Sequence, residues 1–307
     1  MTTLAAARGP KGTLSGARSA LSGILRTNSG RVGVVLLAIA VFICLFGGFF
    51  APYSPTAVVG LPGAPPGQGH PLGLDFIGRD VLSRVLYAGR STLLLAGLAI
   101  ILTYALGGAI GLIAGFSRSM VDPLLMRGID ILLSVPALLV ILLFVTGFGS
   151  GSFVLVIATS LVLLPGAARI VRSATLEVST RGYVEAAIAR GEPTRSILTR
   201  EVLPNVSGVV SADLGLRFSW GIILIASVNF LGVGIQPPTP DLGLMVSENR
   251  VIIGTNSMAV IGPSLVLATL IVGMNGDANT GVQPPAVAGE NPAPRLGSQP
   301  LSRRTSE

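Results

Sequence analysis

Long runs of apolar residues without a single charged side chain recur along this chain. Each run is about long enough to cross a hydrocarbon core of roughly 30 Å. Only 11% of the 307 residues are charged, whereas a soluble domain usually carries about a quarter. The sequence therefore predicts an all-α integral membrane protein.

Six apolar runs are present, and we expect each to form one transmembrane helix. The expected spans are 32–51, 91–116, 129–148, 152–168, 214–235 and 251–274. Pro136 lies near the start of the third run, where proline is a common cause of a kink. Gly107, Gly111 and Gly115 recur at four-residue spacing in the second run, a stripe of small residues that lets another helix approach closely.

Polar segments separate and flank these runs. Residues 1–31 are basic and rich in small residues, and we expect a cytoplasmic segment followed by a retained first span. Residues 52–90 are expected to form an external loop that ends in a short amphipathic helix on the membrane surface, at 75–90. The tail at 276–307 is rich in proline and poor in aliphatic residues, which is typical of disorder.

The distribution of basic residues predicts the orientation. With a cytoplasmic N-terminus, 17 of the 21 lysines and arginines lie on the inner side and four on the outer side. Cytoplasmic loops of membrane proteins carry such an excess. We therefore expect both termini and the polar segment 169–205 in the cytoplasm.

Rare residue types exclude several functions. Cys44 and His70 are the only residues of their kinds, so no disulfide can form within the chain and a zinc site is disfavoured. The only lysine is Lys11, which follows a proline, so the glycine-lysine pair of a Walker A motif is absent. We expect no catalytic residue, metal or cofactor in this chain. Its basic residues are dispersed around apolar runs, which disfavours nucleic acid as a partner.

The expected spans carry no ionisable residue in their interiors, because Asp130 and Arg217 are placed at their cytoplasmic ends. Ion-coupled carriers usually hold such groups inside the membrane, so an ion-coupled secondary transporter is disfavoured and the energy is expected from a partner protein. Asn229 is the deepest polar side chain, with Ser227 nearby. These two are candidates for lining a solute path, and the alternative is a hydrogen bond between helices.

The polar segment 169–205 contains a helix-forming stretch at 183–190 that stops at Gly191. Glu192-Pro193 then restarts a helix, since proline is tolerated in a first turn. The second helix is expected to end near 202–205. Ala186 and Ala187 are small enough for the first helix to enter a groove in a partner, although an ordinary basic amphipathic loop explains the same composition.

Glu185-Ala186-Ala187, Gly191 four residues later and Leu203-Pro204 after twelve more resemble the EAA loop of ABC-importer permeases. Further motifs, in order along the chain, are HPLG at 70–73, GRDVLSR at 78–84, DILLSVP at 130–136 and NFLGVGIQPP at 229–238. Together they resemble the permeases of the dipeptide/oligopeptide/nickel importers over about 70–275. The chain departs from that pattern at 241–242, where tryptophan is common, and after Asp277.

The resemblance implies a type I (MetI-like) permease core at 91–275, in a cell inner membrane, with membrane lipid around it. It implies a sister permease, two ATPase subunits that bind ATP and magnesium, and an external solute-binding protein. Coupling to the ATPase would fall to a helix in the loop at 169–205, with these residues: Glu185, Ala186, Ala187, Gly191, Leu203 and Pro204. The implied function is ATP-driven import of peptides or a related small solute. The alternatives are an ion-coupled secondary transporter and a membrane scaffold that transports nothing.

Overall fold

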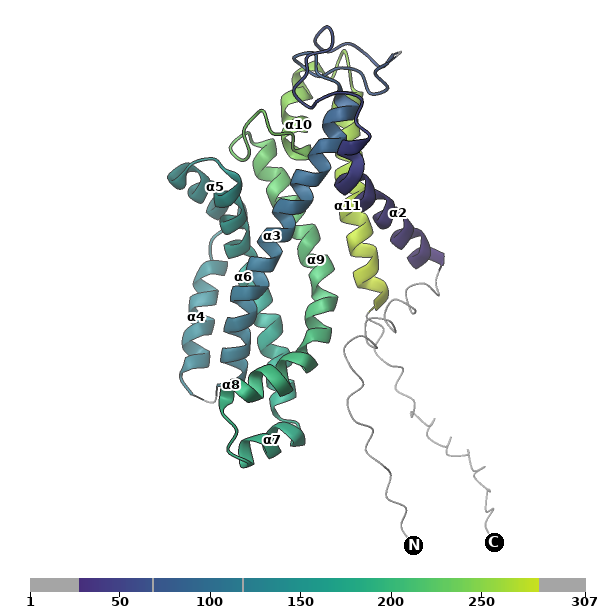
Figure 1. Cartoon of the computed structure of the whole chain (residues 1–307). Helices are drawn as coiled ribbons and strands as arrows, with labels where there is room; N and C mark the ends of the chain where they lie inside the picture. The colour runs from purple at the N-terminus through teal and green to yellow at the C-terminus, as the bar shows by residue number, and fades with distance from the viewer. Residues whose placement is uncertain (1–27, 68, 118, 282–307) are drawn as a thin grey trace, which may run out of the picture.

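The computed structural model describes residues 28–67, 69–117 and 119–281, and this part of the chain is helical apart from its loops and three isolated β-bridges. The α-helices are α2 (Asn28–Phe46), α3 (Val81–Phe116), α4 (Val121–Leu133), α5 (Ala137–Phe148), α6 (Ser152–Ser179), α7 (Gly182–Ala189), α8 (Thr194–Ile197), α9 (Leu203–Phe230), α10 (Leu242–Asn249) and α11 (Met258–Gly281). Figure 1 shows the long helices side by side, with α10 at one end and α7 at the other. The all-α class is confirmed.

Among the described residues, three helical stretches are long and apolar enough to cross a membrane: α3, α6, and Thr194–Phe230, which contains α9. The pair α4 and α5 makes a fourth if it is counted as one broken span. Shorter apolar stretches, Leu37–Phe49 and Met258–Met274, occupy the places of the first and sixth expected spans. Length and composition alone therefore support up to four spans in the described chain.

The expected amphipathic helix at 75–90 is wrong. Helix α3 begins at Val81 and runs without a break to Phe116, where we expected the second span to end. The Asp80 carboxylate accepts a hydrogen bond from the Ser83 amide at 2.8 Å and caps the first turn. The first turns of α3 are buried rather than laid on a surface, because their charged side chains are paired inside the protein.

The third expected span is also wrong as a single helix. Helix α4 stops at Leu133 and α5 starts at Ala137, and their axes differ by 83°. Pro136 explains the break, because its ring disfavours helical geometry at the preceding Val135 and it has no amide hydrogen to donate. The proline interrupts the helix instead of bending it slightly.

Two helices extend beyond their apolar runs. Helix α6 continues to Ser179, because Val171, Ala174 and Val178 keep an apolar stripe buried at helical spacing. Helix α9 begins at Leu203 rather than Leu214 and follows α8 through a π-helical turn, η2 (Leu198–Val202). The predicted end of the second loop helix near 202–205 is therefore wrong.

The predicted close approach of the glycine stripe to another helix is confirmed, and its partner is α6. A Cβ atom added at Gly111 would lie 2.6 Å from the Ala168 carbonyl oxygen, and one added at Gly115 would lie 2.7 Å from that of Arg172. Both distances are too short for any side chain. The backbones of α3 and α6 therefore touch along this stripe.

Helix α11 follows a short 3-10 turn, η3 (Arg250–Ile252), and starts seven residues later than the expected sixth span. It also runs on to Gly281, so residues 276–281 of the tail predicted to be disordered are helical. The rest of that tail and most of the N-terminal segment, residues 1–27, lie outside the described residues.

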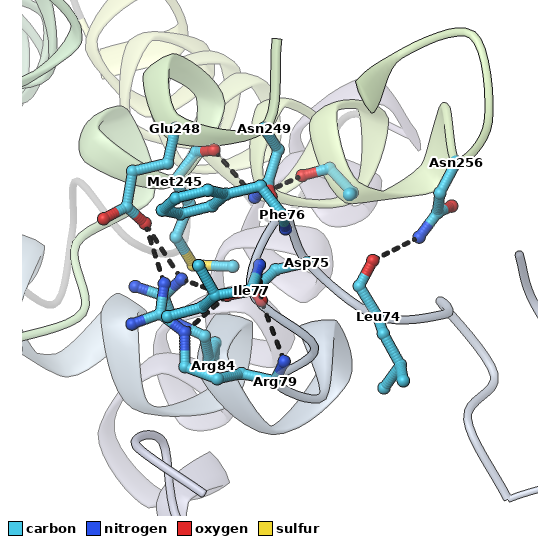
Figure 2. A network of polar contacts seen from close by, with 11 residues as sticks. Leu74, Asp75, Phe76, Ile77, Arg79, Arg84, Met245, Glu248, Asn249 and Asn256 are labelled. Carbon is cyan, nitrogen blue, oxygen red and sulfur yellow. Dashed lines mark hydrogen bonds and ion pairs between the residues drawn. The ribbon is translucent and has the colours of Figure 1, made fainter. Parts of the chain in front are cut away.

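We call residues 50–67, 69–84 and 241–257 together the cap; they lie at the α10 end of the bundle and include the first turn of α3 (Figure 1). Figure 2 shows the ion pairs that hold it. The Asp75 carboxylate accepts hydrogen bonds from Arg79 Nε and Arg84 Nη1, both at 2.6 Å. Glu248 on α10 accepts from Arg84 Nη1 at 2.9 Å, and Asn249 accepts from the Phe76 amide at 3.1 Å. The two halves of the cap are thereby joined through buried charges.

Candidate functional site

The sequence pointed to the polar segment 169–205. We call residues 171–206 the lobe; it forms the end of the bundle opposite the cap, with α7 outermost (Figure 1). A small apolar core holds it together. Its buried members are Val171, Ala174, Val178, Val184, Ala187, Ile197, Val202 and Val206. These residues come from α6, α7, α8, η2 and α9. The short helix α7 therefore packs against the ends of the two long helices α6 and α9.

Helix α7 presents one face to this core and the rest to solvent. Val184 and Ala187 have no exposed surface, whereas Glu185 and Ala186 are exposed. The prediction that both alanines can enter a partner's groove is therefore wrong for Ala187. The small side chain of Ala187 lets α7 lie close against the core of the lobe, whereas Ala186 stays exposed.

Gly191 ends α7 as predicted, with a left-handed φ of +75°. Its amide donates to the Ile188 carbonyl at 2.9 Å, and the Glu192 amide donates to that of Ala187 at 3.2 Å. This pair of hydrogen bonds is the Schellman motif, which satisfies the last carbonyl groups of a helix. The left-handed backbone, rather than a steric contact, requires glycine here, since nothing would lie within 4 Å of a Cβ atom.

Leu203 and Pro204 lie at the junction of η2 and α9, and both are exposed. Proline inside a helix normally removes a hydrogen bond and clashes with the preceding turn. Here the Leu203 amide donates to the Leu198 carbonyl, five residues back. That π-helical turn shifts the hydrogen-bond pattern just ahead of Pro204, so the helix continues through the proline.

The ion pairs of the lobe are mostly exposed. Arg181 donates to Glu177 at 3.0 Å, with 49% and 74% of the two side chains exposed, and Arg190 donates to Glu192 at 2.6 Å. Exposed pairs of this kind contribute little to stability. The charged side chains of the lobe therefore lie mostly on its surface, and its apolar core provides most of its stability.

A cavity of about 530 Å³ lies between the lobe and the adjoining ends of α3 and α4. Ile113 and Phe116 of α3, with Val121 of α4, line one side, and Ile188 and Leu198 of the lobe line the other. Sequence reasoning missed this cavity, because its walls come from segments up to 85 residues apart.

Ser227 and Asn229 lie near the other end of α9 and are not brought together with the lobe. The Ser227 hydroxyl donates to the Ile223 carbonyl at 2.7 Å, within its own helix. Asn229 is fully buried, and its side-chain oxygen accepts from the Ile235 amide at 2.9 Å. The Asn229 contact holds the turn that follows α9, whereas the Ser227 bond stays within the helix. Their role in a solute path stays a prediction.

The charge-capped N-terminus of α10 adjoins that turn. The Asp241 carboxylate accepts hydrogen bonds from the Gly243 amide at 2.9 Å and the Thr92 hydroxyl at 2.7 Å. Complete burial raises the pKa of this carboxyl, and the hydrogen bonds oppose that shift. The departure from the family pattern at 241–242 thus serves as a helix cap that ties α10 to α3.

One polar group inside the bundle was missed. Arg217 was expected at the end of a span, but α9 begins eleven residues before the expected fifth span, and Asp213 and Arg217 pair in the middle of this helix, with 8% and 13% of their side chains exposed. The Tyr104 hydroxyl of α3 donates to the same carboxylate at 2.5 Å. The spacing of Asp213 and Arg217, one helical turn apart, was the available signal.

Comparison with known proteins agrees with the motifs. Residues 107–276 match the family model described as "Binding-protein-dependent transport system inner membrane component". The chain is 35% identical over 257 residues to the di/tripeptide transport system permease protein DppC of Pseudomonas aeruginosa, covering 80% of this chain and 84% of the relative.

Two further relatives come from Haemophilus influenzae. The chain is 31% identical to its dipeptide transport system permease protein DppC, covering 80% of this chain and 85% of the relative. It is 32% identical to the oligopeptide transport system permease protein OppC, covering 79% and 78%. This chain is therefore a member of the family of binding-protein-dependent transport system inner membrane components.

Proposed function

We propose that this chain is a permease subunit of an ATP-driven importer and forms a translocation pathway for peptides together with a sister permease. The names of its relatives, which are permeases for dipeptides, tripeptides and oligopeptides, support the choice of solute. Two ATPase subunits would bind and hydrolyse ATP with magnesium, and an external solute-binding protein would deliver the peptide.

The observation that carries this proposal is the construction of the lobe. Helix α7 lies at the outer end of the lobe (Figure 1) and exposes Glu185 and Ala186, while its other face packs against α6 and α9. Such a helix can dock on a partner and pass its movement to the bundle. In this proposal Glu185 and Ala186 contact the ATPase, Ala187 and Gly191 fix the position of α7, and Leu203 and Pro204 join the lobe to α9.

The proposed arrangement in the membrane has six spans, with both termini and the lobe in the cytoplasm and the cap outside. The asymmetry of basic residues supports this orientation. Helices α2 and α11 and the broken pair α4 and α5 would supply the spans beyond the three long ones. ATP binding would draw the two lobes of the permease pair together and open the pathway outward, and hydrolysis would return it inward.

Reconstitution tests the proposal. The chain, its sister permease, the ATPases and the binding protein are placed in liposomes, and uptake of a radiolabelled dipeptide is measured. We expect uptake that requires ATP and survives collapse of the ion gradients. Uptake driven by an ion gradient without ATP would instead indicate a secondary transporter, and normal assembly without any uptake would indicate a scaffold.

A variant at Ala186 tests the docking surface. We expect Ala186→Trp to lower both ATPase co-purification and peptide uptake, because an indole would not fit a groove shaped for a methyl group. The matched control is Ala212→Trp, which places the same side chain at an exposed position on α9 outside the lobe. Full uptake by the Ala186→Trp variant would remove this face of α7 from the mechanism.

A further inference from the structure

The polar group formed by Tyr104, Asp213 and Arg217 connects three long helices. Asp213 and Arg217 belong to α9, and Tyr104 belongs to α3. Arg217 donates through Nε to Asp213, while its Nη1 reaches the Leu163 carbonyl of α6 at 3.4 Å. A Cβ atom at Gly166 would lie 2.5 Å from Arg217 Nη1. The glycine therefore leaves room for the guanidinium against α6.

The group lies deep in the apolar part of the bundle. No charged residue occurs between Arg90 and Arg118, and Tyr104 stands at the midpoint of this interval. A run of 27 residues at about 1.5 Å each exceeds the hydrocarbon thickness. In the proposed arrangement, in which α3 spans the membrane, the midpoint of this run falls near the membrane centre. Charged residues at such depth are costly and usually functional. Here the cost of burial is reduced because the Asp213 carboxylate accepts hydrogen bonds from both the Arg217 guanidinium and the Tyr104 hydroxyl.

The position of the group along α9 relates it to the lobe. The described chain is helical without interruption from Thr194 to Phe230, so α8, η2 and α9 move as one piece. Arg217 follows Leu203 by 14 residues, or about 21 Å along the helix axis. Near this level the Ser219 hydroxyl of α9 also donates to the Ile271 carbonyl of α11 at 3.4 Å, a long contact that involves neither α3 nor α6. The ionic group joins α9 to α3 and α6 at one level along the bundle axis.

We propose that Tyr104, Asp213 and Arg217 form a tether through which movement of the lobe is transmitted by α9 to α3 and α6. The three side chains are positioning residues for transport, since each acts through the helices that it joins. This inference rests on the proposed function, in which an ATPase moves the lobe. Without the tether, α9 moves with the lobe but α3 and α6 do not, and ATP is hydrolysed without movement of peptide.

The test separates coupling from stability. Removing one member of a buried ion pair strands the other charge, whereas replacing both with apolar residues of similar size is often tolerated. The decisive variant is therefore the double change Asp213→Leu with Arg217→Met. Peptide uptake and ATP hydrolysis are measured together in liposomes containing the full complex, with a radiolabelled dipeptide as the probe.

We expect the double variant to assemble and hydrolyse ATP while moving at least about fivefold less peptide per ATP, the lower end for coupling between distant sites. Tyr104→Phe, which removes one hydrogen bond and leaves the ion pair, should lower the same ratio by a smaller factor. The control is Thr103→Val, because the neighbouring buried hydroxyl contacts only carbonyl oxygens of α3 and α6.

A ratio of peptide to ATP equal to that of the unmodified complex, in the double variant, would overturn the tether. A proportional fall of uptake and hydrolysis would also overturn it, because that result indicates a role in assembly. If the double variant does not assemble, Tyr104→Phe decides, and an unchanged ratio rejects the proposal. Failure of the proposed function is recognised separately, by an unmodified complex whose uptake does not need ATP.

Discussion

The cap and the lobe close opposite ends of the same bundle but are held together by opposite kinds of interaction. In the cap, buried charges join segments far apart in the chain: Arg84 is fully buried and bonds Glu248, 164 residues away. In the lobe, a continuous stretch of 36 residues packs through small apolar side chains, and its charges are mostly exposed. The cap therefore uses its charges internally, whereas the lobe keeps its charges on its surface.

The largest effect should follow from breaking the charge cluster of the cap. Arg84→Met leaves Glu248 and Asp75 with fewer cations inside the protein, and removal of one partner of a buried pair typically costs about 3–5 kcal/mol. We expect a large fall in the thermal unfolding midpoint of the detergent-purified chain. Arg90→Met is the control, because Arg90 lies on the same helix and is exposed. Equal shifts for the two variants would show that the burial of Arg84 is unimportant.

The lobe should respond to overpacking instead of charge removal. Ala187→Leu adds three carbon atoms at a position with no exposed surface, and overpacking a well-packed core typically costs about 1–3 kcal/mol. Ala186→Leu adds the same atoms at the exposed neighbouring position and should leave the unfolding midpoint nearly unchanged. A larger loss from Ala186→Leu than from Ala187→Leu would reverse the assignment of the two faces of α7.

Backbone strain at the end of α7 should have a somewhat smaller effect. Gly191→Val forces a β-branched residue into the left-handed region, which costs roughly 1–2 kcal/mol for an L-residue. Gly191→Asn should cost less, because asparagine visits this region more readily. Limited proteolysis of the lobe measures the result. Equal cleavage of the two variants would mean that φ at this position is free to change.

Local features could be predicted from the sequence. The apolar runs gave the all-α class and the end of α3 at Phe116, and the glycine spacing gave the close approach of α3 to another helix. Gly191 was identified as a helix stop because the reason lies within one turn of helix. In each case the residues that decide the structure are neighbours in the chain.

Features that depend on distant partners were missed. The charges at 75–84 suggested a surface helix because Glu248, which neutralises Arg84, lies in another part of the chain. Arg217 was placed at the end of a span because the contacts that make its burial tolerable include the Leu163 carbonyl, 54 residues earlier, and its partner Asp213 is in turn bonded by Tyr104. Ala187 was assigned to a partner because sequence alone cannot tell which face of a short helix its own chain covers. A local pattern gives the period of a helix but not the identity of its neighbours.

The smallest effect is expected from the exposed ion pairs of the lobe, and it completes the contrast with the cap. Arg181 and Glu177 lie one turn apart on a solvent-facing surface, where such pairs contribute about 0–1 kcal/mol. A double-mutant cycle with Arg181→Met and Glu177→Gln should give a coupling energy within that range. High salt should reduce it further, because exposed charges are screened within roughly 10 Å at 0.1 M. The Arg84 cluster, being buried, should keep its contribution in the same salt. A strong, salt-resistant coupling between Arg181 and Glu177 would mean that the lobe, like the cap, is held by its charges, and the distinction between the two ends would fail.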